Sequence, residues 1–279
     1  MDIGIFAKTF SRPSLIETLD AVRHSGLRTI QFNMALAGGP SMPEAISDEL
    51  AVEIHRATAD RGLRMAAVSG TYNMSHPDPE VRADGRRRLG ALIAAARGLG
   101  TDVVTLCTGS RDAADMWRGH PDNTTAEAWH DMIASVEAAV RQAESHGVTL
   151  AFEPEHNNVV GSAAAARRLL DEIGSPHLKV VIDAANLVEG DELDQQRATL
   201  HEAFELLGGD LVLAHAKDVR DDGSIVAAGR GALDYDEYLA LLARVAGERV
   251  PLILHGLSEP EVSTSVAFLR AALARAAVR

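Results

Sequence analysis

The sequence predicts an α/β protein built as a single closed (β/α)₈ barrel, and three observations lead to that prediction. Eight short apolar runs alternate with eight longer segments that carry helix-capping and helix-ending residues. Four successive runs in the second half end on a carboxylate or a histidine, and a parallel barrel presents its chemistry at the C-terminal ends of its strands. The length of 279 residues fits the roughly 250 residues that such barrels often reach as one domain. We therefore expect one domain spanning residues 1–279.

In the first half of the chain, the expected strands are apolar runs, and the expected helices begin near polar caps and stop at glycines. Ser11 or Ser14 is the expected N-cap of the first helix, and Gly26 its stop. A long polar loop, Thr108–Asn123, follows the fourth strand, and loops of this length in compact domains are often functional. The expected strands are Ile3–Ala7, Arg28–Phe32, Arg64–Val68 and Asp102–Cys107, and the expected helices are Ser11–Ser25, Ser47–Arg61, Glu80–Leu99 and Thr125–His146.

The second half repeats the same alternation. The expected strands are Val148–Phe152, Leu178–Asp183, Leu211–His215 and Pro251–His255, and the expected helices are Ser162–Ile173, Leu193–Leu207, Asp234–Val245 and Glu259–Ala277. An open doubly wound sheet is the rival architecture, and it usually carries a glycine-rich dinucleotide fingerprint after its first strand. Here that position reads AKTFSRP, so the closed barrel is the simpler interpretation.

Composition excludes several classes of partner. Acidic residues outnumber basic ones 40 to 27, which gives a formal net charge of −13. A protein that binds duplex nucleic acid or an anionic membrane needs a basic surface, so we expect neither partner. An anionic small substrate stays possible, because the field in a cleft is set locally. The single cysteine, Cys107, the absence of a signal-peptide pattern and the lack of an apolar run of about 18 residues together predict a cytoplasmic protein.

Four residues of types that bind metal ions stand at the ends of successive expected strands: Glu153, Asp183, His215 and His255. About one βα unit separates each from the next, so their side chains are expected to meet at one rim of the barrel. Carboxylate and imidazole together suit Mn²⁺, Fe²⁺, Co²⁺ or Zn²⁺ better than Ca²⁺. The sequence therefore predicts a site for one divalent metal ion. The alternative is that they are unrelated polar residues at strand ends.

These motifs resemble the xylose-isomerase-like TIM-barrel superfamily, the sugar and sugar phosphate isomerases and epimerases, with inosose isomerases and dehydratases among them. The resemblance covers essentially the whole chain. Glu153 in AFEPE, Asp183 in VVIDAANL and His215 in LAHAKD match the positions where that family holds one metal ion, and GRGALD (Gly229–Asp234) also looks like the family. The expected ion is Mn²⁺, with Co²⁺, Zn²⁺, Mg²⁺ or Fe²⁺ as alternatives.

The end of the eighth strand departs from the family pattern. Where the family usually places a glutamate, this chain has His255 in LILHGLSE. Histidine can still bind a metal ion or carry a proton. Glu259 is expected in the first turn of the last helix, where an acid suits the helix dipole. The departure argues against a symmetric epimerase mechanism with two glutamates.

Further residues near the strand ends are candidates for catalysis or substrate binding. Lys217 follows His215 at the spacing of two that points both side chains to one face of a strand, so we expect it to act with Glu153 and His255 in catalysis. A surface lysine in a salt bridge is the alternative. The candidate substrate contacts lie in the loop after the fourth strand and beyond later strands: Arg111, Trp117, His120, Glu155, Asn186 and Arg230. Packing, helix capping or surface charge are the alternatives for these.

The resemblance implies a divalent-metal-dependent isomerase or epimerase of a small keto-sugar or related polyol carbonyl compound. The expected path is a metal-stabilised enediolate, with the proton moved by a side chain such as Glu153. A lyase, dehydratase or decarboxylase, acting on a 3-oxo sugar or sugar acid is the alternative. A non-catalytic sugar-binding barrel and a nuclease of the same fold are further alternatives, and the acidic charge counts against the nuclease. Ala-rich helices such as Ala271–Ala277 are compatible with a homo-oligomer.

Overall fold

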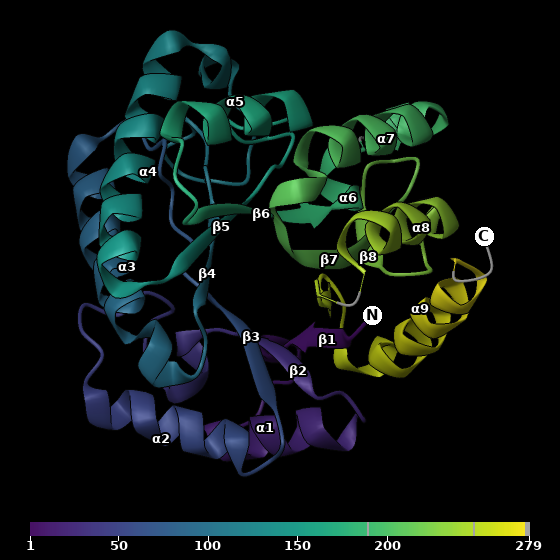
Figure 1. The fold of residues 1–279 in the computed structure, drawn as a ribbon, viewed down its shortest axis with the longest axis horizontal. Coiled ribbons are helices and arrows are strands. Elements are labelled where there is room, and N and C mark those ends of the chain that lie inside the picture. The colour runs from purple at the N-terminus through teal and green to yellow at the C-terminus, as the bar shows by residue number, and fades with distance from the viewer. Residues whose placement is uncertain (189, 248, 277–279) are drawn as a thin grey trace.

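The computed structural model describes residues 1–188, 190–247 and 249–276. Its centre is a closed barrel of eight parallel strands, because β6 pairs with β7 and so joins the two ends of the sheet. Figure 1 shows the strands at the centre and the helices around them. The barrel strands are β1 (Ile3–Phe6), β2 (Thr29–Phe32), β3 (Arg64–Ser69), β4 (Val103–Cys107), β5 (Thr149–Glu153), β6 (Leu178–Asp183), β7 (Leu211–Val219) and β9 (Leu252–Leu254). The predicted fold class is confirmed.

Most helices lie within a few residues of the predicted bounds, but the helix predicted from Leu193 begins at Gln196, and the helix predicted from Glu259 begins at Val262, because a short 3-10 helix precedes each. Ser14, not Ser11, caps the first helix by accepting a hydrogen bond from the backbone N–H of Glu17, so that helix starts at Leu15. The helices are α1 (Leu15–His24), α2 (Asp48–Ala59), α3 (Pro79–Leu99), α4 (Ala126–His146), α5 (Ala163–Ile173), α6 (Ala184–Leu187), α7 (Gln196–Leu207), α8 (Tyr235–Ala246) and α9 (Val262–Ala276). The predicted end of the last helix, Ala277, lies outside the described residues. None of the described helices is both long enough and apolar enough to span a membrane.

Two hydrophobic layers hold the barrel together. The larger layer lies between the strands and the surrounding helices, and it contains residues such as Leu19, Leu92 and Leu239. The smaller cluster comes from side chains on the other face of the strands, away from the helices. It consists of Phe6, Ala66, Ala67, Ala151, Val181, Leu213 and Ile253. Because side chains of a strand alternate between its two faces, the residues between these positions point toward the helices. Small alanines in the inner cluster leave room for the polar side chains at the rim.

The seventh strand is longer than predicted. β7 runs to Val219 rather than ending at His215, because a short antiparallel strand, β8 (Ile225–Ala227), pairs with its outer end. Asp218 holds the returning chain, since its buried carboxylate accepts hydrogen bonds from the backbone N–H groups of Gly229 and Leu233 at 3.0 and 3.1 Å. Lys217 therefore lies within a strand and not in a loop.

Candidate metal centre

The ends of three neighbouring strands bring Glu153, Asp183 and His215 together. Asp183 on β6 is the register partner of His215 on β7, and Glu153 ends the adjacent strand β5. One ligand atom from each of the three residues lies within 4.8 Å of the others. Asp183 is fully buried, and only a small part of His215 is exposed. The predicted convergence of these three side chains at one rim of the barrel is therefore present.

One carboxylate oxygen of Asp183 accepts no hydrogen bond from the described residues and lies beside the ammonium of Lys217, facing the other two candidate ligands. Its Oδ1 accepts a hydrogen bond from the backbone N–H of Ala185 at 3.0 Å, whereas its Oδ2 has no hydrogen-bond partner among the described residues. Burial raises the pKa of Asp183, and the neighbouring charge of Glu153 adds to that rise. Two carboxylates and an imidazole meet here, and the single positive charge of Lys217 balances only one of the two carboxylates. Such a set of oxygen and nitrogen donors suits a divalent cation. The residues present therefore fit a divalent metal ion.

Gln31 on β2 orients the imidazole of His215. The Oε1 atom of Gln31 lies 2.7 Å from His215 Nε2, while its Nε2 donates to the hydroxyls of Ser69 and Thr105. Because both amide hydrogens have acceptors, the amide oxygen faces the histidine and accepts its Nε2–H. Nδ1 of His215, 3.1 Å from Glu153 Oε1, is then the ring nitrogen that would bind a metal ion. An imidazole held in this way by a hydrogen bond to its other nitrogen is typical of metal sites.

Lys217 and Asn186 surround the two carboxylates. Lys217 Nζ lies 3.2 Å from Asp183 Oδ2 and 3.6 Å from Glu153 Oε1, and it donates to Asn186 Oδ1 at 2.9 Å. Asn186 Nδ2 in turn donates to Glu153 Oε1 at 2.5 Å. Burial alone would lower the pKa of Lys217, but the charges of Asp183 and Glu153 outweigh it and raise that pKa. The lysine is thus a buried cation aimed at the centre, as its spacing from His215 predicts.

His255 lies beside the cluster but outside it. Its ring stacks on His215 with centroids 5.1 Å apart and on Phe6 at 5.2 Å. Its Nδ1 is buried and has no hydrogen-bond partner in the described part of the chain. Burial, reinforced by the positive charge of Lys217, holds the pKa of His255 well below its usual range. Its roles as metal ligand and proton carrier therefore stay predictions.

Glu259 binds Arg12 and not the metal centre. Its carboxylate forms an exposed bidentate ion pair with the guanidinium of Arg12, with nitrogen–oxygen distances of 2.6 and 2.8 Å. It lies in the first turn of the short helix that precedes α9, as the sequence predicts. It therefore does not reach back to replace the glutamate that the family places at the end of the eighth strand.

Glu155 is a second acid near the centre. It follows β5 by two residues and is partly buried. Burial and the negative charge of Glu153 raise its pKa to about 7. The backbone N–H of His156, next in sequence, donates to the carbonyl of Asn186 at 3.1 Å. The loop after β5 is thus tied to the segment after β6. A carboxylic acid with a pKa near neutrality is suited to exchange protons with a substrate.

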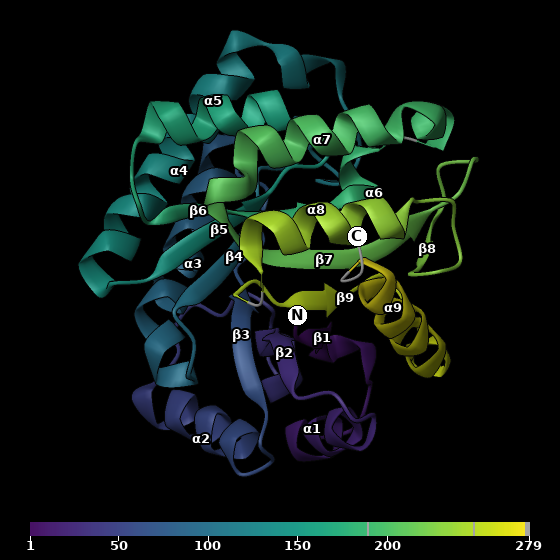
Figure 2. The ribbon, with the colours of Figure 1, turned by 45° about the vertical axis from the view of Figure 1, so that its right-hand side comes forward.

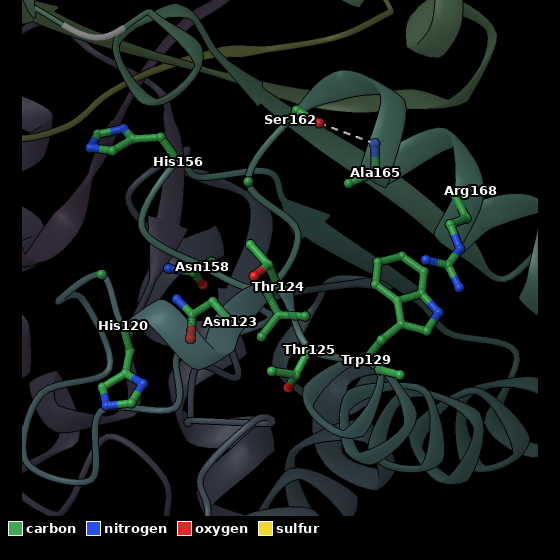
Figure 3. A pocket seen from close by; sticks show the side chains of 14 residues that line it. His120, Asn123, Thr124, Thr125, Trp129, His156, Asn158, Ser162, Ala165 and Arg168 are labelled. Atoms are coloured by element: carbon green, nitrogen blue, oxygen red, sulfur yellow. Dashed lines mark hydrogen bonds between the residues drawn. The ribbon is translucent and has the colours of Figure 1, made fainter.

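The residues predicted in the loop after β4 lie away from the three ligands. Arg111 is buried, and its guanidinium contacts Asp131 of α4 at 2.8 Å. Trp117 is 48% exposed. His120 and His156 line a cavity of about 620 Å³ between the loops that follow β4 and β5. In Figure 3 these two histidines lie on the side opposite Trp129 and Arg168, which stack on each other. Substrate contact by Arg111, Trp117 and His120 stays a prediction.

Arg230 lies in a different cavity, of about 700 Å³, which His255 also lines. This cavity opens at the ends of β1, β7 and β9, next to the stacked histidines. The sequence prediction missed two residues of this region. Phe6 looks like an ordinary apolar residue of the first strand. Gln31 is one of two polar residues in the run TIQF, the other being Thr29. A buried polar residue within an apolar strand is the signal that indicates Gln31.

Comparisons with known proteins agree with this architecture. The model of a family described as "Xylose isomerase-like TIM barrel" matches residues 19–272. No curated protein matches the chain. Among solved structures, an L-ribulose 3-epimerase superposes with a TM-score of 0.77 at 20% identity, covering 99% of this chain and 96% of its own.

Two further structures illustrate the range of proteins with this fold. A 3-keto-D-glucoside 4-epimerase from E. coli has a TM-score of 0.73 at 18% identity and covers 97% of this chain and 99% of its own. A probable 3-DHS dehydratase from Bacillus anthracis has a TM-score of 0.73 at 13% identity, covering 97% and 98%. At these identities the likeness shows the fold alone.

Proposed function

This chain belongs to the xylose isomerase-like TIM barrel family, and we propose that it is a divalent-metal-dependent isomerase or epimerase of a small keto-sugar or related polyol carbonyl compound. The observation that carries the proposal is the buried cluster of Glu153, Asp183 and His215 at the C-terminal rim of the barrel. Sugar epimerases among the structures of similar fold support the same reaction class. We further propose Mn²⁺ as the ion and the cytoplasm as the location.

Glu153, Asp183 and His215 would hold the ion. A divalent cation supplies Lewis acidity, which polarises a substrate carbonyl and lowers the cost of removing the neighbouring proton. Glu155, with a pKa near 7, is placed to take up or return a proton at neutral pH. Lys217, a buried cation beside both carboxylates, stabilises negative charge that develops on the substrate oxygen. Return of the proton to the adjacent carbon gives isomerisation, and return to the opposite face gives epimerisation.

A lyase is the second candidate, and His255 is the observation that favours it. A symmetric epimerase needs two acid–base groups of similar strength on opposite faces of the substrate. Here the strand ends offer Glu153 at the end of β5 and His255 just after β9, and burial holds the pKa of His255 well below its usual range. An unequal pair is suited to remove a proton on one side and to assist a leaving group on the other. The 3-DHS dehydratase of similar fold shows that the architecture is also found in a protein named as a dehydratase.

Metal content tests the proposal. The wild-type protein should bind about one equivalent of Mn²⁺, Co²⁺ or Zn²⁺ per chain. Asp183→Ala should lose the metal together with turnover of keto-sugars or inososes, because removing one of three protein ligands leaves too few to hold the ion. Asp171→Ala, an exposed aspartate on α5, is the matched control and should keep both. A wild-type protein that retains no divalent ion under any condition would favour the non-catalytic sugar-binding barrel.

A further inference from the structure

A second cavity adjoins the metal centre at the rim of the barrel. It has a volume of about 700 Å³ and lies where the ends of β1, the β7–β8 hairpin and β9 meet. In Figures 1 and 2 the hairpin strand β8 lies near α9 at this end of the molecule. Three cations, Lys8, Arg220 and Arg230, line the cavity together with Phe6 and His255. Three gathered cations are unusual in a chain whose net charge is −13.

These three cations form no direct ion pair among the described residues, although the charge of Glu261 acts on both arginines and that of Asp222 acts on Arg220. Lys8 Nζ sits 4.6 Å from the centroid of the Phe6 ring. Within the described residues, no carboxylate lies within ion-pair distance of Lys8, Arg220 or Arg230, and none of their side chains makes a hydrogen bond. All three side chains are exposed to solvent, unlike the buried Arg111, which forms an ion pair with Asp131 at 2.8 Å. Cations left without a partner around one cavity favour an anionic ligand there.

Neutral serine groups hold the two nearby carboxylates, which keep their negative charge. Glu261 also lines the cavity, but its carboxylate accepts hydrogen bonds from the N–H and hydroxyl of Ser258 at 2.9 and 2.7 Å. Asp222, at the tip of the hairpin, accepts a hydrogen bond from the N–H of Ser224 at 2.9 Å. The cavity therefore keeps a net positive charge, because one glutamate faces three cations.

The cavity and the metal centre share a wall. His255 lines the cavity, and its ring stacks on His215 at 5.1 Å between centroids. The buried Nδ1 of His255 has no hydrogen-bond partner among the described residues, so a polar ligand atom can satisfy it. One imidazole ring thus separates a cationic cavity from a metal ligand.

We propose that this cavity binds an anionic terminal group, a carboxylate or a phosphate, of an open-chain keto-sugar whose carbonyl end lies at Glu153, Asp183 and His215. The inference rests on the proposed function for the position of the carbonyl end. Among keto-sugars and related polyol carbonyl compounds, it favours sugar acids and sugar phosphates over neutral sugars. Arg220 and Arg230 offer planar guanidinium groups suited to carboxylate or phosphate oxygens, and Lys8 offers a point charge.

Three ligands that differ only at the end of the chain test this proposal: D-fructose, D-fructuronate and D-fructose 6-phosphate. Calorimetric titration of the full-length protein, metal-loaded and chelated, should show at least one anionic ligand binding roughly tenfold more tightly than D-fructose, because its charged oxygens form charge-assisted hydrogen bonds with the cations of the cavity. A preference for D-fructuronate identifies a carboxylate site, and a preference for D-fructose 6-phosphate identifies a phosphate site.

Substitutions of the three cations test whether the cavity causes the preference for anionic over neutral ligands. Lys8→Gln, Arg220→Gln and Arg230→Gln should each reduce the ratio of anionic to neutral affinity several-fold, whereas Arg244→Gln, an exposed arginine on α8, should leave it unchanged. Equal affinity for all three ligands, no detectable binding of either anion at millimolar concentration, or an unchanged ratio in all three cavity variants would overturn the proposal. Because the ratio is also measured on chelated protein, loss of metal or turnover alone would instead count against the proposed function.

Discussion

At the scale of single residues, the arrangement of the centre depends on a hydrogen bond that crosses the barrel. Gln31 on β2 and His215 on β7 are joined at 2.7 Å, although 184 positions separate them in sequence. Both side chains are buried, so water does not compete for this hydrogen bond. The bond assigns the proton to Nε2 of the imidazole and leaves Nδ1 to face Glu153.

Gln31→Leu should weaken metal binding without removing any ligand. The variant deletes the acceptor for the Nε2–H of His215, so the ring loses both its preferred tautomer and its orientation. Loss of such a partner typically costs 10–100-fold in metal affinity. The measurement is a competitive titration with a chelator of known affinity, followed by turnover at saturating metal.

Two further variants separate this role from a packing defect. Gln31→Glu keeps an oxygen acceptor at the same position and should recover most of the affinity. Ser69→Ala removes one acceptor of the glutamine amide, at 3.1 Å, without touching the histidine, and should change affinity little. Equal metal affinity in Gln31→Leu and wild type would show that Gln31 does not orient the ligand.

The sequence analysis predicted the three clustered side chains but not Gln31, the residue that orients His215. Glu153, Asp183 and His215 follow from a rule of the fold, because they stand at the ends of adjacent parallel strands. Gln31 does not follow from any local pattern, since its role depends on which residue lies across the barrel. Arg111 was singled out by its position in a long loop, but position does not reveal that Asp131 holds its guanidinium.

At the scale of elements, Asp218 fixes the hairpin that extends β7. Its carboxylate accepts hydrogen bonds from the N–H groups of Val219, Gly229 and Leu233. The returning chain passes so close that a Cβ on Gly231 would lie 2.3 Å from Asp218 Oδ1. The motif GRGALD thus holds the loop that carries Arg230 against the end of β7.

Asp218→Ala should destabilise the protein by about 2–4 kcal/mol, because it leaves buried N–H groups without acceptors. Gly231→Ala should cost a comparable amount through the clash with the same carboxylate. Gly209→Ala is the matched control, since a Cβ there meets nothing within 4 Å. Urea unfolding followed by circular dichroism measures all three, and a stability of Gly231→Ala equal to that of Gly209→Ala would contradict the account.

Asp210 links three elements and gives stability a dependence on pH. It lies just before β7 and accepts hydrogen bonds from Lys179 of β6 at 2.6 Å and Arg167 of α5 at 2.9 Å. Burial alone would raise the pKa of Asp210, but these two cations outweigh it and lower that pKa. A carboxylate with a lowered pKa in the folded state stabilises the protein above its unfolded pKa, near 3.9.

Asp210→Asn should therefore cost about 1 kcal/mol at neutral pH, the size expected for a partly exposed ion pair. The difference from wild type should stay constant from pH 8 to about 5 and shrink below about pH 4, because the wild-type carboxyl becomes neutral there. Urea midpoints across this range measure it. A difference that persists unchanged to low pH would mean that the charge of Asp210 contributes nothing.

Prediction of the elements succeeded where local signals are strong and failed where distant pairing decides. Caps such as Ser14 and Ser47 and apolar runs such as Leu178–Asp183 mark helices and strands within a few residues. The three-residue strand β8 has no such pattern, and it exists because Asp218 and β7 hold it. The four-residue helix α6 is also too short for a periodic signal and follows from the Asp183 cap.

At the scale of the whole molecule, the charge distribution favours binding of a small anionic ligand and opposes binding of a polyanion such as DNA. The chain carries a net charge of −13, yet three cations line one cavity beside the centre. A cavity of about 700 Å³ can take one carboxylate or phosphate group. Duplex DNA presents many phosphates to an extended surface, and binding it requires a basic footprint that the overall composition does not supply.

The protein should therefore neither bind nor cleave DNA that contains abasic sites. In about 100 mM salt, a fluorescently labelled duplex with one abasic site should show no change in anisotropy at protein concentrations up to about 10 µM, since repulsion by the acidic surface opposes contact with successive phosphates. The same duplex should stay intact after incubation with Mn²⁺ or Zn²⁺, and a known abasic endonuclease is the positive control. Saturable binding or strand cleavage that is lost in Asp183→Ala would replace the sugar isomerase proposal with a nuclease that uses the same three ligands.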